Sequence, residues 1–141
     1  MYKDTVTIFN RYRFPTGDVW YPTVLHGVDL NIDHAAITAK YGENSRDNAK
    51  LHIKVDGGTV GGKTYVQPKE YQALLSTNGY ITFAAGEEFD FFFAGEWAGA
   101  VRDADYLDGF YNYMNTRFDN VFAISSVAQY IVIPHFEIMG R

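Results

Sequence analysis

Alternating polar and apolar residues mark strands at both ends of this chain. Residues 4–12 and 18–33 each carry the period-two pattern of a half-buried strand, and turn residues occupy the short stretch between them. This arrangement predicts an antiparallel pair, with Pro22 at an edge position or a bulge of the second strand. Residues 121–126 and 129–139 alternate in the same way, which predicts a second, closing strand pair.

The middle of the chain is less regular. Residues 51–55 resume the strand alternation, and the glycines at 57–62 predict a flexible connection after them. Further short strands are predicted at 80–83 and 88–93. Two short helical stretches are predicted at 35–41 and, with a proline in its first turn, at 68–75, and the polar residues 43–48 indicate a solvated loop.

The main helix is predicted over about residues 103–118. Apolar residues recur there every three or four positions, and Asp103 and Asp105 suit the positive end of a helix dipole. Gly109 would lie in the middle of this helix and weaken it. The expected fold is mainly β (α+β): a single domain, residues 1–141, built as a small antiparallel β-barrel or sandwich with this one main helix.

Composition narrows the classes of function. The formal net charge is −5 and the lysines and arginines are scattered singly, so there is no basic stripe for tight DNA binding, although a lining for the passage of DNA is compatible with this charge. The absence of cysteine excludes disulfides, thiol nucleophiles and thiolate metal sites. No apolar run has the length of a membrane span or a signal-peptide core, so we expect a soluble, cytosolic protein where it is made.

The candidate chemistry does not converge on a reaction. A metal site is considered at His26, Asp29, Asp33 and His34, but positions 26 and 29 face opposite sides of a strand. Neither a metal nor another cofactor is therefore predicted. Ser125-Ser126 lacks the flanking glycines of a nucleophile elbow. Gly57–Gly62 lacks the amphipathic helix that follows a phosphate loop, so we interpret it as the glycines of a hairpin.

Two acidic residues invite a paired-carboxylate hypothesis. Glu88 and Asp90 would share one strand face about 6–7 Å apart. We interpret them instead as the solvent side of a strand whose core side is Phe89, Phe91 and Phe93. Phe92 would then be an exposed aromatic residue on the acidic face, which indicates a contact surface. The sequence therefore favours an assembly part over an enzyme.

Both ends of the chain carry a resemblance to a known family. Asp4-Thr-Val-Thr-Ile-Phe-Asn-Arg-Tyr12 and Trp20-Tyr-Pro-Thr-Val-Leu-His-Gly-Val28 look like the N-terminal strand pair of the small minor-capsid, or head-closure, proteins of siphophages and prophages of Gram-positive bacteria. Residues 51–55 lie where that family has its third strand, 86–95 resemble its central segment, and 120–127 and 135–141 resemble its closing segments. The longer centre, with its glycines at 57–62 and a tyrosine-rich stretch at 106–113, departs from the pattern. The whole chain is also similar to an uncharacterised prophage family of about this length.

The resemblance implies a structural virion protein with no cofactor. Its β-barrel subunit would be made in the host cytoplasm and stack as a homo-oligomeric, dodecameric ring beneath the portal and its adaptor in the virion neck. Such rings retain the packaged DNA and dock the tail. In that family a loop between the second and third strands projects into the channel as a stopper. Here the loop would run from His34 to Lys50, with His34, Ile37, Lys40, Tyr41, Glu43, Asn44, Arg46, Asp47 and Lys50 as candidate residues.

Ring assembly also requires two different patches on each subunit. The candidates for one of them are Phe92, Trp97, Tyr111 and Tyr113. One alternative is another neck or tail component, such as a tail terminator, which would contact the tail tube in place of the portal adaptor. The other is a small ligand-binding or enzymatic β-barrel that uses the aromatic helix and the Glu88/Asp90 face, which requires a pocket with a carboxylate of raised pKa.

Overall fold

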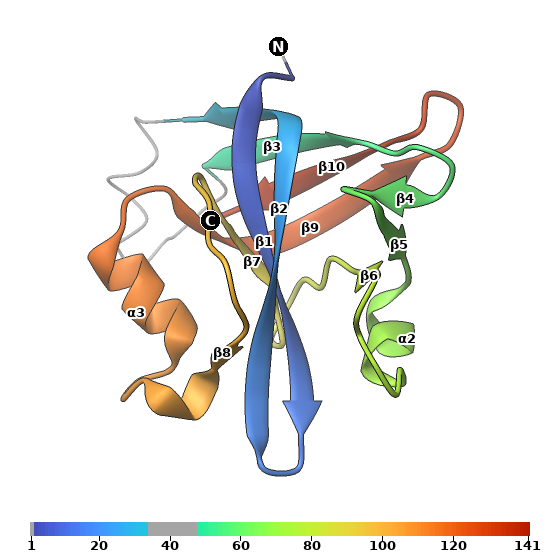
Figure 1. Ribbon diagram of the computed structural model, residues 1–141. Helices are drawn as coiled ribbons and strands as arrows, with labels where there is room; N and C mark the ends of the chain where they lie inside the picture. Colours follow the sequence, from blue (N-terminus) through green and yellow to red (C-terminus); the bar gives the residue numbers. More distant parts are fainter. Residues whose placement is uncertain (1, 34–47) are drawn as a thin grey trace.

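Six antiparallel strands close into a barrel in the computed structural model, which describes residues 2–33 and 48–141 (Figure 1). Around the barrel the order is β1-β7-β9-β10-β3-β2, and pairing of β2 with β1 closes the circle. The prediction of a small antiparallel β-barrel is confirmed. The strands are β1 (Asp4–Phe14), β2 (Gly17–Ile32), β3 (Ala49–Lys54), β7 (Phe91–Phe93), β9 (Val121–Tyr130) and β10 (His135–Gly140).

The longest element is the β1–β2 hairpin, whose tip projects away from the rest of the barrel (Figure 1). Its strands pair from Asp4 with Val28 to Phe14 with Gly17, and Gly17 has a φ of 132°, which favours glycine. Pro22 lies between the part of β2 that pairs with β8 (Val101–Arg102) and the part that pairs with β3, so the missing N–H of proline interrupts neither ladder. The predicted edge position of Pro22 is confirmed.

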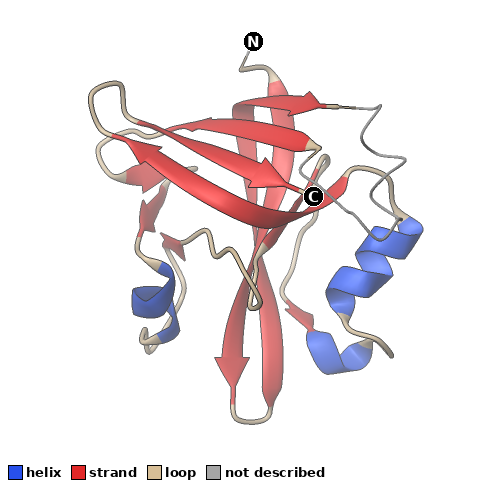
Figure 2. Ribbon diagram, turned by 180° about the vertical axis from the view of Figure 1, so that it is seen from behind, coloured by secondary structure: helices blue, strands red, loops and turns tan. Residues whose placement is uncertain are grey.

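Two smaller units flank the hairpin on opposite sides (Figures 1 and 2). One unit contains η1, a 3₁₀ turn, and the helix α3. The other is a three-stranded sheet with the helix α2, which begins at a proline and buries Tyr71. The bounds are η1 (Asp103–Asp105), α3 (Phe110–Arg117), β4 (Thr59–Val60), β5 (Lys63–Tyr65), β6 (Tyr80–Ile81) and α2 (Pro68–Gln72).

The apolar side chains form two cores, one inside the barrel and one outside it. Ile8 and Phe92 belong to the inner core, whereas their neighbours Phe9 and Phe91 belong to the outer core under α3. Consecutive residues of β1 and β7 are therefore buried on both faces of the sheet. Trp20, Phe110 and Met114 also belong to the outer core, between the hairpin and α3.

The main helix is shorter than predicted, because α3 begins only at Phe110 and residues 103–105 form a separate 3₁₀ turn. Gly109 has a φ of 88°, outside the helical region, and it caps the helix instead of lying within it. Leu107, one of the apolar residues that recur along the predicted helix, is fully exposed. Within the described parts of the chain, no helix is long and apolar enough to cross a membrane.

Candidate functional site

The projecting part of the β1–β2 hairpin is fixed to both flanking units. On the α3 side, the Phe9 ring stacks on Phe91 at 4.6 Å and meets Phe110 edge-on at 5.2 Å. On the α2 side, the Tyr12 hydroxyl donates a 2.7 Å hydrogen bond to the Leu74 carbonyl oxygen. The hairpin is therefore a braced projection and not a free arm.

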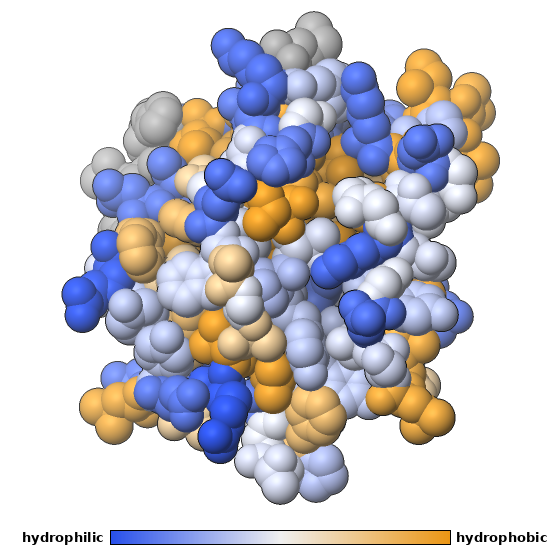
Figure 3. All heavy atoms as spheres, in the orientation of Figure 1, coloured by the Kyte–Doolittle hydropathy of each residue, from blue (hydrophilic) through white to orange (hydrophobic). Residues whose placement is uncertain are grey.

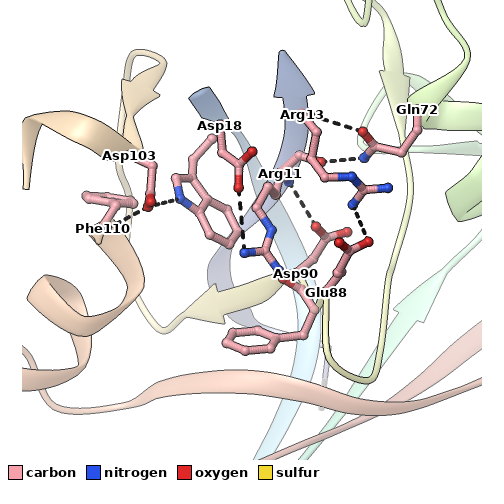
Figure 4. A network of polar contacts seen from close by, with 10 residues as sticks. Arg11, Arg13, Asp18, Gln72, Glu88, Asp90, Asp103 and Phe110 are labelled. Atoms are coloured by element: carbon pink, nitrogen blue, oxygen red, sulfur yellow. Dashed lines mark hydrogen bonds and ion pairs between the residues drawn. The ribbon is translucent and has the colours of Figure 1, made fainter. Parts of the chain in front are cut away.

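A buried carboxylate lies where the hairpin meets the barrel (Figure 4). Asp90 is 1% exposed, and one of its oxygens accepts a 2.9 Å hydrogen bond from the Arg11 backbone N–H. Its other oxygen accepts hydrogen bonds from Asn10 Nδ2 at 2.9 Å and from the Ala84 N–H at 3.0 Å. Burial raises the pKa of Asp90 to about 7, against the opposing effect of these three donors.

The position of Asp90 overturns our interpretation of Glu88 and Asp90 as one solvent-facing pair. Glu88 is exposed as expected, but Asp90 is enclosed and ties β1 to the segment before β7. The signal in the sequence was the aromatic run 89–93, which is typical of a strand covered on both faces. A single acid inside such a run is buried with partners and does not point into solvent.

A second set of polar contacts holds α2 against the hairpin (Figure 4). Gln72 accepts a 3.1 Å hydrogen bond from the Arg13 N–H and donates one of 2.6 Å to the Arg11 carbonyl oxygen. The Arg13 guanidinium pairs with Glu88 at 2.8 Å, with both side chains largely exposed. Exposed ion pairs of this kind contribute little to stability, so the amide of Gln72 carries most of the positioning.

Asp103 joins the hairpin to α3 on the other side (Figure 4). Its Oδ1 accepts hydrogen bonds of 2.9 Å from both Trp20 Nε1 and the Phe110 N–H. The second of these caps the first turn of α3, although Asp103 lies seven residues earlier in the chain. One carboxylate oxygen thus orients the buried indole and starts the helix.

Replacing Asp103 with alanine is expected to lower the free energy of unfolding by about 2–3 kcal/mol, because a helix cap and the partner of a buried indole N–H are lost together. Asp103→Asn keeps an oxygen acceptor and should cost less than about 1 kcal/mol. Urea unfolding followed by tryptophan fluorescence measures both values. Asp105→Ala, an exposed acid of the same turn, is the matched control. Equal effects at positions 103 and 105 would contradict this role.

The predicted interface residues fall into two places. Trp97, Tyr111 and Tyr113 are partly buried around the outer core, where Trp97 and Tyr113 contact the Phe110 ring and Tyr111 contacts Phe91. Phe92 is different, because its side chain is fully buried inside the barrel and lies 5.4 Å from the Phe122 ring. The prediction that Phe92 is exposed at an interface is wrong, since the aromatic strand is covered on both sides.

A pocket of about 220 Å³ opens beside the start of α3. Tyr106, Leu107, Gly109 and Tyr113 contribute to its lining, and the Tyr106 and Tyr113 rings pack against each other at 4.6 Å. The pocket is mainly apolar. Of the predicted interface residues, Tyr113 is the one that lines it.

The predicted stopper segment is mostly outside the described residues, because His34, Ile37, Lys40, Tyr41, Glu43, Asn44, Arg46 and Asp47 all lie in 34–47. Its two flanks are described. The Asp33 N–H donates a 2.7 Å hydrogen bond to the Asn48 carbonyl oxygen, so the chain leaves and re-enters the barrel at one place. Lys50 belongs to β3, where its ammonium group lies 3.6 Å from Glu137.

The β9–β10 hairpin ends in an exposed apolar tip. The alternating pattern of the sequence did not predict this tip. Ile131, Val132 and Ile133 are 82%, 97% and 75% exposed, and Tyr130 beside them is 46% exposed. We predicted one strand over 129–139, but residues 131–134 form a turn. Pro134 is the signal that would have found this turn, because proline cannot donate to a sheet ladder.

Histidine and acidic side chains gather on the outer face of β10 and β3. His135 Nε2 and His52 Nε2 lie 3.1 Å and 3.5 Å from the two oxygens of Glu137. Hydrogen bonds to the Ile133 carbonyl oxygen and to Glu137 raise the pKa of His135. Among the described residues, no group of three or more histidine and acidic side chains has the arrangement of a metal site. The cluster is a set of polar contacts on the barrel surface beside the base of the tip.

The chain belongs to DUF6751, a family of unknown function, whose match spans residues 1–141. Neither a curated protein nor a solved structure matches it significantly.

Proposed function

We propose that this chain is a structural subunit of a phage neck, a head-closure or head–tail connector protein that assembles as a ring under the portal and its adaptor. The observation that carries the proposal is that the barrel strands lie in the same parts of the chain as the segments that resemble head-closure proteins. All six barrel strands lie within or overlap the segments that resemble head-closure proteins. The two flanking units, β4–β6 with α2 and η1 with α3, occupy the parts in which the chain departs from that family.

The barrel suits a part that must carry load and surround a passage. Each barrel strand is paired on both sides, so the barrel has no free edge. The β1–β2 hairpin projects from the barrel and is held by contacts with the two flanking units. The hydrogen bond between Asp33 and Asn48 brings the two flanks of the predicted stopper segment together at the barrel. A net charge of −5 suits a conduit that DNA must leave quickly.

The ligand-binding alternative is less well supported. It requires a carboxylate of raised pKa in a concave pocket, and Asp90 has the raised pKa. However, the Asp90 side chain is buried and both of its oxygens accept hydrogen bonds from the protein itself, so a substrate does not reach it. The raised pKa is a property of the barrel core.

Quantitative mass spectrometry of purified particles from the phage or induced prophage that encodes the chain tests the proposal. We expect about one copy of the chain for each portal subunit, because the proposed ring stacks on the portal with matching symmetry. Electron microscopy of particles made without the gene should show tailless heads that have lost their DNA. Complementation with the wild-type gene should restore tailed, filled particles.

Other outcomes separate the alternatives. Absence of the chain from particles would overturn the connector proposal. Tails of uncontrolled length beside intact, filled heads in the deletion strain would point to a tail terminator. Complementation with Glu88→Gln, a change at an exposed ion pair, is the control for nonspecific effects of mutation and should behave as the wild type does.

A further inference from the structure

The tip of the β9–β10 hairpin presents three aliphatic side chains in a fixed arrangement. The Tyr130 ring stacks on His135 at 4.6 Å and 5°, and His135 Nδ1 donates to the Ile133 carbonyl oxygen at 2.6 Å. The Val55 N–H also donates to the Pro134 carbonyl oxygen at 3.2 Å, which ties the turn to the strand beside it. Ile131, Val132 and Ile133 are thus held outward before any partner arrives, which lowers the entropy cost of binding.

A hollow apolar surface lies on the opposite side of the molecule. It is the pocket of about 220 Å³ beside α3, with the fully exposed Leu107 at its rim. Figure 3 shows hydrophobic residues at the upper right and at the lower left, where Figure 1, in the same orientation, places the β9–β10 hairpin tip and the chain below α3. The tip is convex and the pocket is concave, so the tip of one molecule has a shape that can enter the pocket of another.

The charges around the two surfaces also differ. Lys54 lies beside the tip with its ammonium group 4.4 Å from the Tyr2 ring centre, and His135, opposite Lys54 in the β3–β10 ladder, pairs with Glu137. Asp108 lines the pocket and Asp105 is exposed nearby. Arg117 at the far side of the pocket is occupied by the Tyr113 ring, with its guanidinium 5.3 Å from the ring centre. Lys54 beside the tip would thus lie near Asp108 if the tip enters the pocket of another molecule.

We propose that the occupant of the α3 pocket is the Ile131–Ile133 tip of a second copy of this chain. Such a contact is head-to-tail, because the two surfaces are different and lie on opposite sides, and repeated contacts of this kind build a ring or an open filament. Tip-to-tip pairing would instead bring two convex surfaces together. The contact supplies the lateral surface of the ring and to that extent rests on the proposed function.

A single contact of this size is weak. Three aliphatic side chains and one pocket are small compared with the roughly 1,200–2,000 Å² that a stable protein interface buries. We therefore expect a transient contact in dilute solution, strengthened when a ring closes or a partner aligns several copies. The test must trap a transient contact, and the absence of cysteine from the chain allows this with engineered thiols.

The experiment mixes two full-length variants, Val132→Cys and Leu107→Cys, and oxidises them at equal concentration. We expect disulfide-linked heterodimers to form about tenfold faster than homodimers of either variant. The matched control replaces Leu107→Cys with Leu75→Cys, an equally exposed leucine of the other flanking unit. Adding Ile133→Asp to the Val132→Cys chain should slow heterodimer formation about ten- to hundredfold, because an aliphatic side chain no longer enters the pocket.

Three outcomes would overturn the proposal. These are equal rates with Leu75→Cys and Leu107→Cys, faster homodimers of Val132→Cys, or no effect of Ile133→Asp. Sedimentation with phosphatidylcholine–phosphatidylglycerol vesicles that depends on the tip, without heterodimers, would assign the tip to a lipid surface instead. The same cysteine pair oxidised within particles separates the two hypotheses. Particles that contain the chain but give no heterodimer contradict this contact alone, whereas heterodimers of a chain that is absent from particles contradict the connector role alone.

Discussion

Replacing Phe92 with alanine is expected to lower the free energy of unfolding by about 3–5 kcal/mol, the usual cost of removing a buried phenylalanine ring. Phe92 is fully buried, pairs with Ile8 on one side and with Phe122 on the other, and its ring packs against Gly140. The space left by the ring cannot be filled by neighbours that are fixed in barrel ladders. Urea unfolding followed by circular dichroism measures the loss.

The same variant separates a core residue from the interface residue that the sequence predicted. An interface residue would leave the unfolding of the single chain almost unchanged when truncated, whereas a core residue would not. Val132→Ala, at a position that is 97% exposed, is the control and should change the free energy of unfolding by less than about 0.5 kcal/mol. If Phe92→Ala does not fold, Phe92→Leu should fold with a smaller loss of about 1.5 kcal/mol. A loss below about 1 kcal/mol for Phe92→Ala would contradict its place in the core.

The strands of the barrel were predictable because their pattern follows from local physics. Residues 4–12 and 18–33 alternate over long stretches, and the turn between them contains a proline and a glycine, so both the strands and their pairing follow from the sequence. The closing pair β9–β10 was predicted for the same reason. The pairing of β1 with β7 was not predicted, because it depends on contacts between segments that are distant in the sequence.

The errors around residues 88–93 have one cause. Alternation assigns one face of a strand to the core and the other to solvent, but β7 is covered by the barrel interior on one face and by α3 on the other. Phe92 and Asp90 were both assigned to solvent on that basis, and both are buried. The aromatic run 89–93 indicates that both faces of this strand are covered, but it does not identify the helix that covers the outer face.

The start of α3 and the apolar tip illustrate a second limit of prediction from apolar patterns. The pattern of apolar residues continued through 103–109, but the chain turns sharply at Gly109 and a distant Asp103 supplies the cap. At the tip, Ile131, Val132 and Ile133 have strand propensity, yet they form a turn and pair with none of the described strands. In both places Gly109 and Pro134 carried more information than the apolar residues around them.

Asp90 is expected to make the protein less stable as the pH rises from about 4 to about 7. The pKa of this carboxyl group is about 7 in the folded protein and 3.8 in an unperturbed carboxyl group. Between these values the folded state holds a proton that the unfolded state has released, so the free energy of unfolding falls by up to about 1.4 kcal/mol for each pH unit. Below about pH 4 and above about pH 7 this contribution no longer changes.

Asp90→Asn isolates this effect, because the variant keeps the shape of the side chain and cannot titrate. Both oxygens of a protonated carboxyl group can still accept hydrogen bonds, whereas the amide replaces one of them with an NH₂ group among three N–H donors, so we expect a loss of about 2–4 kcal/mol at pH 4.5. Urea unfolding of both proteins at several pH values between 4.5 and 7.5 should show the difference between them shrinking as the pH rises. Glu88→Gln, the exposed neighbour, should show no such trend. A difference that grows with pH would mean that the three donors outweigh burial and that Asp90 is a stable buried carboxylate.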